Sequence, residues 1–461
     1  MPKPFKTNTM KNYFTLFFFS LLFSFSLTLN AQNYFDKTFD FGSIDHPQAI
    51  VTDASQNAYI CGWFEDANYQ NPRAFVIKTD DKGQEMWRVS LDMPSKFYAL
   101  CVTHEGNVAL AGSRNGNCFL ISLDGQTGTE LWKYEEQNSD DYWFGTVNEV
   151  LDNGTYNLYV VKTKDAPHPI WYYLFNPTTG NYVKDDKNTQ NPIFGRTYTS
   201  GLITPELVWS AGTYETSGLV VADNFGVGES PLWSFSAPHI AGVQKYSDGK
   251  GSVLISSSSP GQNTYFQILI MDVINGHVYG EYFDNNNNNS IVTGSGMLDN
   301  NKFIITGTID NELALWFIDY DMTTLEDKTI ATANPRTGID VVGLPSTDIY
   351  LMGTEETGNA DATDVFLMKL DQNGALSVPE NSKDVVFSVY PNPAANQLNI
   401  KSNGQSLSHA QAYIVNSMGQ TVKIITNLSR PIDLSNLTKE LYVLMVYNNN
   451  KLVSQQKFIK K

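Results

Sequence analysis

Two short segments, AYICG at residues 58–62 and FVIKTDDKGQEMW at residues 75–87, decide the fold because the chain repeats their pattern. The first is a strand-like apolar run that ends in a glycine, and the second is an apolar strand that ends in an aspartate. A turn containing Gly83 and a strand containing Trp87 complete the pattern. With a strand leading in, each copy has about four short strands, a unit that cannot bury both of its faces alone.

Seven copies of this unit follow one another at intervals of about 45–50 residues, a period typical of β-propellers. Stacking the units radially buries their faces, so the sequence predicts an all-β chain with a seven-bladed β-propeller, with six or eight blades as alternatives. The repeated strand ends at Gly62, Gly112, Gly212, Gly307 and Gly353, with Lys162 and Ser257 in two weaker copies.

The last copy lacks its final strand, whereas NYFDKTFDFG at residues 33–42 has the features of a final strand without a blade. We expect this N-terminal strand to complete the seventh blade, which closes the ring and leaves no open sheet edge. In each copy, the Asp or Asn of the turn should accept hydrogen bonds from the turn backbone. The recurring Trp or Tyr should pack as an apolar wedge against a neighbouring blade.

The segment LDGQTGTELWKYE at residues 123–135 resembles the tryptophan-docking repeats of quinoprotein-like propellers. The first copy, which begins with IVTDASQNAYICGWF, resembles a propeller repeat common in secreted bacterial proteins. Both resemblances imply the fold and neither implies a chemistry. A quinone would require a lined central pocket and a bound cation, for which the sequence holds no further pattern, so we expect no cofactor.

The first 31 residues have the pattern of a secretory signal peptide, with three lysines followed by the apolar run FTLFFFSLLFSFSLTL and the small residue Ala31. A membrane anchor is the alternative, but 16 residues are short for a membrane span. Cleavage after Ala31 would leave Gln32 first. We expect a mature protein without a transmembrane segment, either secreted or attached to the cell surface.

Charge divides the chain at about residue 380. Residues 32–379 carry 44 acidic and 19 basic side chains, a net charge of −25, whereas residues 380–461 carry 4 and 9, a net charge of +5. The acidic charge of residues 32–379 argues against nucleic acid as a partner, because nucleic acid binding requires Lys and Arg to replace counterions. The three cysteines, Cys61, Cys101 and Cys118, lie in strand-like runs and are too few for a disulfide framework, so we expect buried thiols.

A second module follows a linker at residues 379–384, so that we expect the propeller at 32–378 and the module at 385–461. It begins with YPNPAANQLNI at residues 390–400, where two prolines exclude a helix and favour an extended entry into a strand. Two hairpins, around residues 417–419 and 448–450, predict a small Ig-like β-sandwich. An ordinary accessory module is one interpretation of it.

The ordered motifs of this module resemble the type A C-terminal sorting domain of the type IX secretion system. The resemblance implies export through the outer membrane by contact with that machinery, followed by release or surface attachment. Glu440 and Leu441 depart from the family, which usually has Gly just before the tyrosine of the last hairpin. The matching residues are Tyr390, Pro391, Asn392, Pro393, Gly419, Asp433, Leu437, Tyr442, Lys460 and Lys461.

No nucleophile elbow, metal-binding His or Cys motif, or EF-hand loop occurs in the sequence, so we lean against an enzyme. The acidic loop TEETGNADATD at residues 354–364 offers Glu355, Asp361 and Asp364 as oxygen ligands for Ca²⁺. Their spacing is irregular, which favours a solvated loop over a metal site.

The loops between the second and third strands and those between blades share one face of a propeller. Trp63, Tyr69, Tyr142 and Trp143 should lie on this face among polar residues, an arrangement that suits an extracellular glycan or protein. An equally good interpretation is that these aromatic side chains cover the apolar core beneath their loops. The sequence favours a non-catalytic binding protein, with a carbohydrate- or peptide-active enzyme or a structural spacer as alternatives.

Overall fold

The structure of the protein, a computed structural model, describes residues 34–376 and 387–461 apart from short segments within them. Within residues 186–265 it describes only the backbone of the strands. The expected signal peptide at residues 1–31 and the expected linker at residues 379–384 lie outside the described residues. The segments left out are 93, 138, 140, 153, 165–170, 188–196, 205–206, 215–216, 225–232, 238–239, 246–249, 258–264, 273–274, 285–289, 299–301, 320–324, 359–361, 403–409, 417–420, 427, 429 and 449–450.

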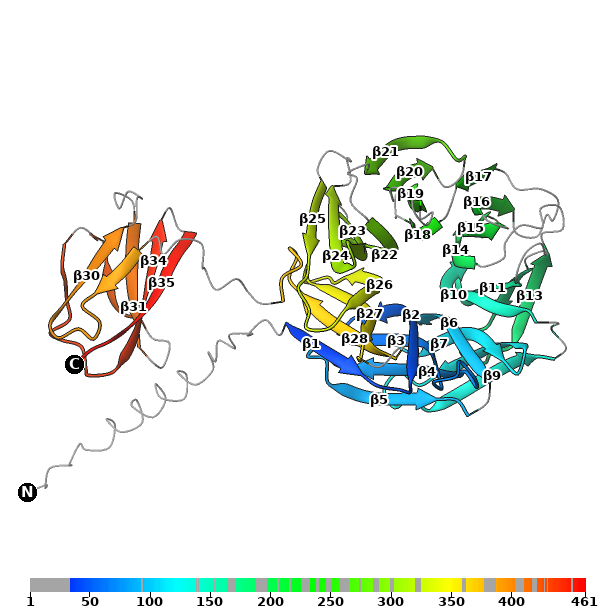
Figure 1. Cartoon of the computed structure of the whole chain (residues 1–461), viewed down its shortest axis with the longest axis horizontal. Coiled ribbons are helices and arrows are strands. Elements are labelled where there is room, and N and C mark those ends of the chain that lie inside the picture. Colours follow the sequence, from blue (N-terminus) through cyan, green and yellow to red (C-terminus); the bar gives the residue numbers. More distant parts are fainter. Residues whose placement is uncertain are drawn as a thin grey trace, which may run out of the picture. The chain divides into compact units, whose positions relative to one another are not determined.

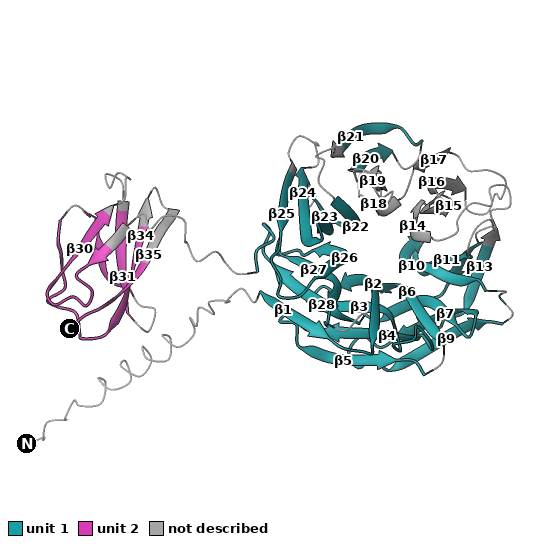
Figure 2. Ribbon diagram, in the orientation of Figure 1, with its two compact units in different colours: residues 1–376 teal, residues 377–461 magenta. Residues whose placement is uncertain are grey.

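The chain forms two compact units, residues 1–376 and residues 377–461 (Figure 2). In the first unit, the described strands form seven antiparallel groups of four, arranged around a ring (Figure 1). The predicted seven-bladed β-propeller is therefore confirmed, and the weaker copies three and five each form a blade as well.

The blades consist of the following strands. Blade 1 is β2 (Ile44–Thr52), β3 (Ala58–Glu65), β4 (Arg73–Thr79) and β5 (Glu85–Ser90); blade 2 is β6 (Ser95–Val102), β7 (Val108–Arg114), β8 (Asn117–Leu123) and β9 (Glu130–Glu136); blade 3 is β10 (Trp143–Asp152), β11 (Thr155–Thr163), β12 (Trp171–Phe175) and β13 (Tyr182–Lys187); blade 4 is β14 (Thr197–Thr204), β15 (Leu207–Tyr214), β16 (Ser217–Asn224) and β17 (Trp233–Ala237); blade 5 is β18 (Ile240–Lys245), β19 (Lys250–Ser257), β20 (Tyr265–Asp272) and β21 (Val278–Asp284); blade 6 is β22 (Ser290–Leu298), β23 (Lys302–Ile309), β24 (Glu312–Asp319) and β25 (Leu325–Thr329); blade 7 is β26 (Arg336–Gly343), β27 (Ile349–Glu356), β28 (Thr363–Leu370) and β1 (Phe35–Phe39).

Blade 7 is built from both ends of the repeat region. Strand β1 pairs antiparallel with β28 over five residues, from Phe35 opposite Lys369 to Phe39 opposite Val365. One parallel bridge, between Ile44 and Thr363, also joins blade 7 to β2. The N-terminal strand therefore completes the last blade, as the sequence predicts, and removes the edge that β28 would otherwise expose.

The glycine that ends the second strand of the repeat is required by close approach of the first strand. A Cβ on Gly62 would lie 2.2 Å from the carbonyl oxygen of His46, and the corresponding distance for Gly112 is 1.9 Å. The first strand carries a β-bulge at this point in both blades. In blade 3 Lys162 takes the place of the glycine, and a glycine, Gly145, stands at the bulge itself.

The turns between the third and fourth strands have the predicted side-chain acceptors. Asp124 Oδ1 accepts hydrogen bonds from the backbone N–H groups of Gln126 and Thr127, at 2.9 and 2.8 Å. Gly128 closes the turn with a φ of 71°, a conformation that is strained for other residues. Equivalent acceptors in four other blades are Asp80, Asn176, Asp272 and Asp371.

Aromatic side chains of the outermost strand pack on the turn of the next blade. The Trp87 ring of blade 1 covers Gly128 of blade 2, where a Cβ would lie 2.9 Å from the ring. The Trp132 ring of blade 2 covers Gly180 of blade 3 in the same way, and its Nε1 donates a 2.8 Å hydrogen bond to the Pro177 carbonyl. These contacts confirm that the repeated tryptophan joins neighbouring blades.

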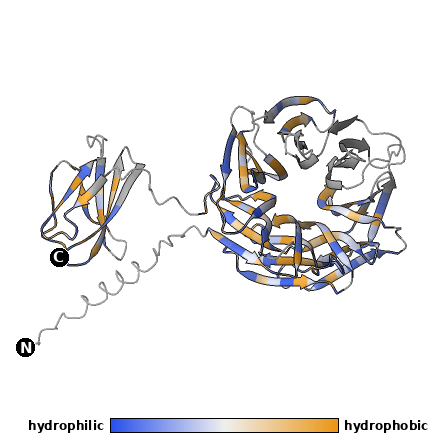
Figure 3. Cartoon of the chain, in the orientation of Figure 1, coloured by the Kyte–Doolittle hydropathy of each residue, from blue (hydrophilic) through white to orange (hydrophobic). Residues whose placement is uncertain are grey.

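The apolar core lies between successive blades, and apolar residues concentrate along the strands (Figure 3). The cluster between blades 1 and 2 includes Tyr59, Phe97 and Phe119, each nearly inaccessible to solvent. The three cysteines are buried free thiols, as expected. Burial raises the pKa of the Cys101 and Cys118 thiols to about 12, so both remain protonated and unreactive at neutral pH.

The C-terminal unit contains two antiparallel sheets that enclose an apolar core centred on Tyr442, Leu444 and Phe458. This arrangement fits the expected Ig-like sandwich. The strands β31 and β32 pair around the predicted turn at residues 417–419, which lies outside the described residues. One sheet contains β29 (Phe387–Tyr390), β30 (Gln397–Ser402) and β33 (Ile432–Asp433), and the other contains β32 (Thr421–Ile425), β31 (Ala410–Val415), β34 (Leu441–Asn448) and β35 (Lys451–Ile459).

The docking of Trp132 predicts a specific loss of stability. Trp132→Ala removes an indole that packs on blade 3 together with its hydrogen bond, and we expect it to cost roughly 2–4 kcal/mol in chemical denaturation. The adjacent Leu131 is 48% exposed, so Leu131→Ala should change the stability by no more than about 0.5 kcal/mol. Equal effects of the two substitutions would show that the tryptophan does not join the blades.

Candidate functional site

A row of aromatic side chains crosses the first three blades on the face that holds the loops between blades. The His46 ring stacks on Trp63 with ring centres 5.1 Å apart. Tyr98 meets Trp63 edge-on at 5.6 Å and lies 5.7 Å from Trp143. The row therefore brings Trp63 and Trp143, two residues that the sequence predicts for this face, into one cluster through Tyr98.

Charged groups lie against one end of this aromatic row. Glu65 is 8% exposed, and its carboxylate oxygens lie 3.4 Å from Lys96 Nζ and 3.5 Å from His46 Nε2. Lys96 Nζ also lies over the Trp63 ring, 4.6 Å from its centre. Burial lowers the pKa of His46, although the Glu65 carboxylate opposes this effect, so the imidazole is neutral at neutral pH.

The β-bulges explain why these side chains meet. In β6, register shifts between Phe97 and Ala99, so that Tyr98 is the extra residue of the bulge. A bulge redirects a side chain from its regular alternation, which accounts for the contact of Tyr98 with rings from both neighbouring blades. Within the described residues, the indole N–H groups of Trp63 and Trp143 are buried and have no hydrogen-bond acceptor.

The four predicted ligand-binding residues therefore differ in their surroundings. Trp63 is 8% exposed and is covered by His46 and Lys96, whereas Trp143 is partly exposed. Tyr69 is 53% exposed and does not join the row. Tyr142 is partly buried and packs against the core between blades 2 and 3, with Lys162 Nζ 4.9 Å from its ring centre.

Sequence reasoning missed three members of the cluster, His46, Lys96 and Tyr98. His46 is one of six scattered histidines, and Lys96 and Tyr98 lie in a first strand rather than in a loop. One signal could have found them. Gly62 and Gly112 mark the positions where the opposing strand bulges, and both Tyr98 and His46 lie at or next to those positions.

A second cluster joins three carboxylates at the closure of the ring. Asp40 follows β1, Asp45 lies on β2 and Asp364 lies on β28, and one oxygen of each lies within 4.8 Å of the others. Asp45 is fully buried, and one of its oxygens, Oδ1, has no hydrogen-bond partner among the described residues. Burial raises the pKa of Asp45 to about 8, the Phe41 amide opposes this shift, and the Asp364 charge adds to it.

This cluster is not the set of candidate Ca²⁺ ligands that the sequence offers, which is Glu355, Asp361 and Asp364. Asp364 belongs to the cluster, Asp361 lies outside the described residues, and Glu355 is engaged elsewhere. Arg336 donates to Glu355 through Nε, at 2.8 Å, and to Asp36 through Nη1. Burial opposes the shift, but hydrogen bonds from Asn334 and Arg336 lower the pKa of Glu355, so this carboxylate is already neutralised by an ion pair.

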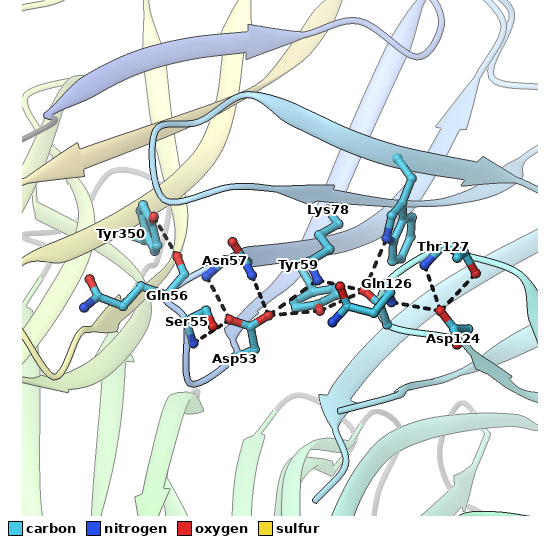
Figure 4. Close-up of polar contacts among 12 residues, drawn as sticks. Asp53, Ser55, Gln56, Asn57, Tyr59, Lys78, Asp124, Gln126, Thr127 and Tyr350 are labelled. Atoms are coloured by element: carbon cyan, nitrogen blue, oxygen red, sulfur yellow. Dashed lines mark hydrogen bonds and ion pairs between the residues drawn. The ribbon is translucent and has the colours of Figure 1, made fainter. Parts of the chain in front are cut away.

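A buried lysine, Lys78, forms a third polar cluster (Figure 4). Its Nζ donates a 2.7 Å hydrogen bond to the Gly125 carbonyl of blade 2 and lies 3.5 Å from Asp53. The Tyr59 hydroxyl contacts the same two groups, and the Trp87 indole donates to the same carbonyl. These contacts hold Lys78 between two blades, so the cluster joins blades and is no candidate for catalysis.

In the C-terminal unit, the Pro-Asn-Pro segment is fastened to the last strand. Asn392 donates from Nδ2 to the Lys457 carbonyl and accepts from the Ile459 amide, both at 3.0 Å. The peptide bonds before Pro391 and Pro393 are cis. Ala394 extends this contact with the end of the chain. It forms a parallel β-bridge with Lys460, and the Lys461 amide donates a hydrogen bond to the Ala394 carbonyl.

The other matching residues of this unit have local structural roles. Tyr442 is buried, stacks on Phe458, and donates its hydroxyl to the Thr438 carbonyl at 3.1 Å. Hydrogen bonds from Ser435 lower the pKa of Asp433 and fix the turn after β33. Leu437 packs against the core, Tyr390 is 52% exposed, and Gly419 lies outside the described residues.

Residues 388–461 match the family model of the secretion system C-terminal sorting domain. This finding confirms the resemblance of the tail to the sorting domain of the type IX secretion system. The tail marks the protein for export by that system, either attached to the cell surface or secreted. No helix in the described part of the chain combines the length and the apolar character that a bilayer span requires.

Solved structures similar to this chain include propellers at low identity. The Dos1 propeller is 13% identical with a TM-score of 0.45, covering 70% of this chain and 77% of its own. PorZ, a surface component of the type IX secretion system of Porphyromonas gingivalis, is 11% identical with a TM-score of 0.46. That match covers 90% of this chain and 59% of PorZ. A comparison with curated proteins gave no significant match.

The sorting domain predicts where a truncated protein accumulates. A chain that ends at residue 387 keeps the complete propeller but lacks the matched segment, so we expect it to remain inside the cell envelope. Fractionation of cells that express the complete or the truncated chain measures this directly. Surface exposure or secretion of both chains in equal proportion would contradict a sorting role for the tail.

Proposed function

We propose that the protein is a non-catalytic binding module of the cell surface or medium, and that it binds its ligand at the aromatic row of blades 1–3. The observation that carries this proposal is the contact of Tyr98 with both Trp63 and Trp143, flanked by Lys96 and Glu65. Ring faces beside charged hydrogen-bonding groups are a frequent composition of carbohydrate and peptide sites.

Within the row, the residues divide into support and contact. Trp63 is held by His46, Lys96 and Tyr98, so it fixes the positions of its neighbours. Tyr98 and Trp143 are partly exposed and offer ring surface to a ligand. Lys96 and His46, with side chains 30% and 31% exposed, offer the adjacent polar contacts.

We favour an extracellular carbohydrate as the ligand. Flat rings stack on the C–H faces of sugars, and the partly exposed Lys96 ammonium and His46 imidazole can bind hydroxyl groups. The net charge of −25 in residues 32–379 disfavours a strongly acidic polymer. A protein ligand is the alternative outcome of the binding experiment.

Catalysis is the competing function, and one observation indicates which residue would carry it. Glu65 is buried beside Lys96 and His46, and buried carboxylates next to ionisable partners serve as general acids or bases in many enzymes. The ion pair with Lys96 already satisfies this carboxylate, however, and a second carboxylate for glycoside hydrolysis is not part of the row.

A glycan array probed with the mature chain, residues 32–461, tests the proposal. We expect Tyr98→Ala and Trp143→Ala to weaken binding at least about tenfold, because each removes a ring from the row. The matched control is Tyr279→Ala, which removes an aromatic ring that is 54% exposed on blade 5 and should leave binding unchanged.

Two results would contradict the proposal. Equal glycan or protein binding by the Tyr98→Ala, Trp143→Ala and control variants would exclude this row as the site. Hydrolysis of a bound glycan or peptide by the mature chain that is lost in Glu65→Gln would instead assign the protein to the enzymes.

A further inference from the structure

Hydrogen bonds account for the carboxylates of Asp40, Asp45 and Asp364 only in part, because the Phe41 amide donates to Asp45 Oδ2 at 3.1 Å and leaves Oδ1 without a partner among the described residues. The three carboxylates come from three separate segments, and their oxygens approach within 4.8 Å. Among the described residues, none of the three takes part in an ion pair. A neighbouring cation, Arg88, donates to the backbone carbonyl of Asp40 at 3.1 Å and pairs its guanidinium with Glu85.

Asp45 supplies the second observation. Its side chain is fully buried, and the Oδ1 oxygen has no hydrogen-bond partner among the described residues. An unpaired buried carboxylate oxygen is costly, and such a group normally pairs with a cation or binds a metal. The backbone of Asp45 is fixed beside Asp364 because the Thr363 hydroxyl accepts from the Asp45 amide and donates to its carbonyl.

The space beside the three carboxylates is large enough to hold further ligands. A cavity of about 470 Å³ opens beside the carboxylates and is lined by Asp40, Gly42, Ser43, Thr357 and Asp364, among others. This volume accommodates an ion with several waters, in addition to hydroxyl and carbonyl oxygens. Its walls come from the segment after β1, the start of β2, Ala67 after β3, the described residues Thr357 and Ala362, and the start of β28.

We propose that Asp40, Asp45 and Asp364 bind one Ca²⁺ ion that fastens the N-terminal segment to blades 1 and 7. An oxygen-only set with three carboxylates is the ligand chemistry of Ca²⁺, and carboxylates at these separations can share one ion at 2.3–2.6 Å. Exported modules bind this ion with dissociation constants of about 10⁻⁴–10⁻³ M, which suits a protein of the cell surface or medium. The site shares no residue with the aromatic row and does not depend on what that row binds.

Calorimetry on the mature chain, residues 32–461, tests the proposal after treatment with EDTA and dialysis. We expect one Ca²⁺ per chain with a dissociation constant at or below about 1 mM, and an unfolding temperature that rises with Ca²⁺ until the site saturates. Asp364→Asn and Asp40→Asn should each weaken Ca²⁺ binding at least about tenfold. The matched control, Glu312→Gln, alters an exposed acid on blade 6 and should bind as the unmodified chain does.

The Ca²⁺-free proteins provide a second measurement. Because the Asp364 carboxylate crowds against Asp40 and the buried Asp45 without the ion, Asp364→Asn should unfold at the same or a higher temperature than the unmodified chain in EDTA, and at a lower one in saturating Ca²⁺. The exposed Asp40 allows the same comparison should the Asp364 variant fold poorly. Absence of Ca²⁺ binding up to about 10 mM, or equal binding by both variants and the unmodified chain, would overturn the site.

Discussion

The pairing of β1 with β28 is the constraint on which the propeller depends. A ring of blades built from one chain has two open ends, and an unpaired β28 would expose its backbone groups. Five residues of β1 cover that edge, and Arg336 adds hydrogen bonds to Asp36 on β1 and to Glu355 on β27. The Phe35 ring also packs on Gly83 of blade 1, so closure joins blade 7 to blade 1.

The same contact recurs around the ring in altered form. Trp87 and Trp132 occupy the position that Phe35 has in blade 7, and each packs on the glycine of the next turn. In blade 1 the buried Lys78 adds a donor to the next turn, and in blade 7 Lys369 lies within 3.4 Å of the equivalent carbonyl, that of Asp81. Blades are therefore joined both by apolar wedges and by side-chain donors that bind one backbone carbonyl of the next blade.

Much of the fold could be predicted from the sequence because it follows from short-range rules. The period of the glycine-ended strand, the Asx-Gly turns and the orphan N-terminal strand each have a local physical cause. The sites depend on register instead. Tyr98 reaches its neighbours because it is the extra residue of a β-bulge. Asp40, Asp45 and Asp364 come together only when the ring closes. Neither contact can be predicted from residues that share one loop, which is why sequence reasoning groups Asp364 with Glu355.

Amide hydrogen exchange of the intact mature chain tests ring closure most directly. If β1 pairs with β28, the amides of Phe35–Phe39 that face β28 should exchange as slowly as those of the inner strands, although they lie only a few residues after the expected cleavage site. Exchange of this segment at the rate of an unpaired chain end, with β28 also unprotected along that edge, would contradict the closure that brings Asp40, Asp45 and Asp364 together.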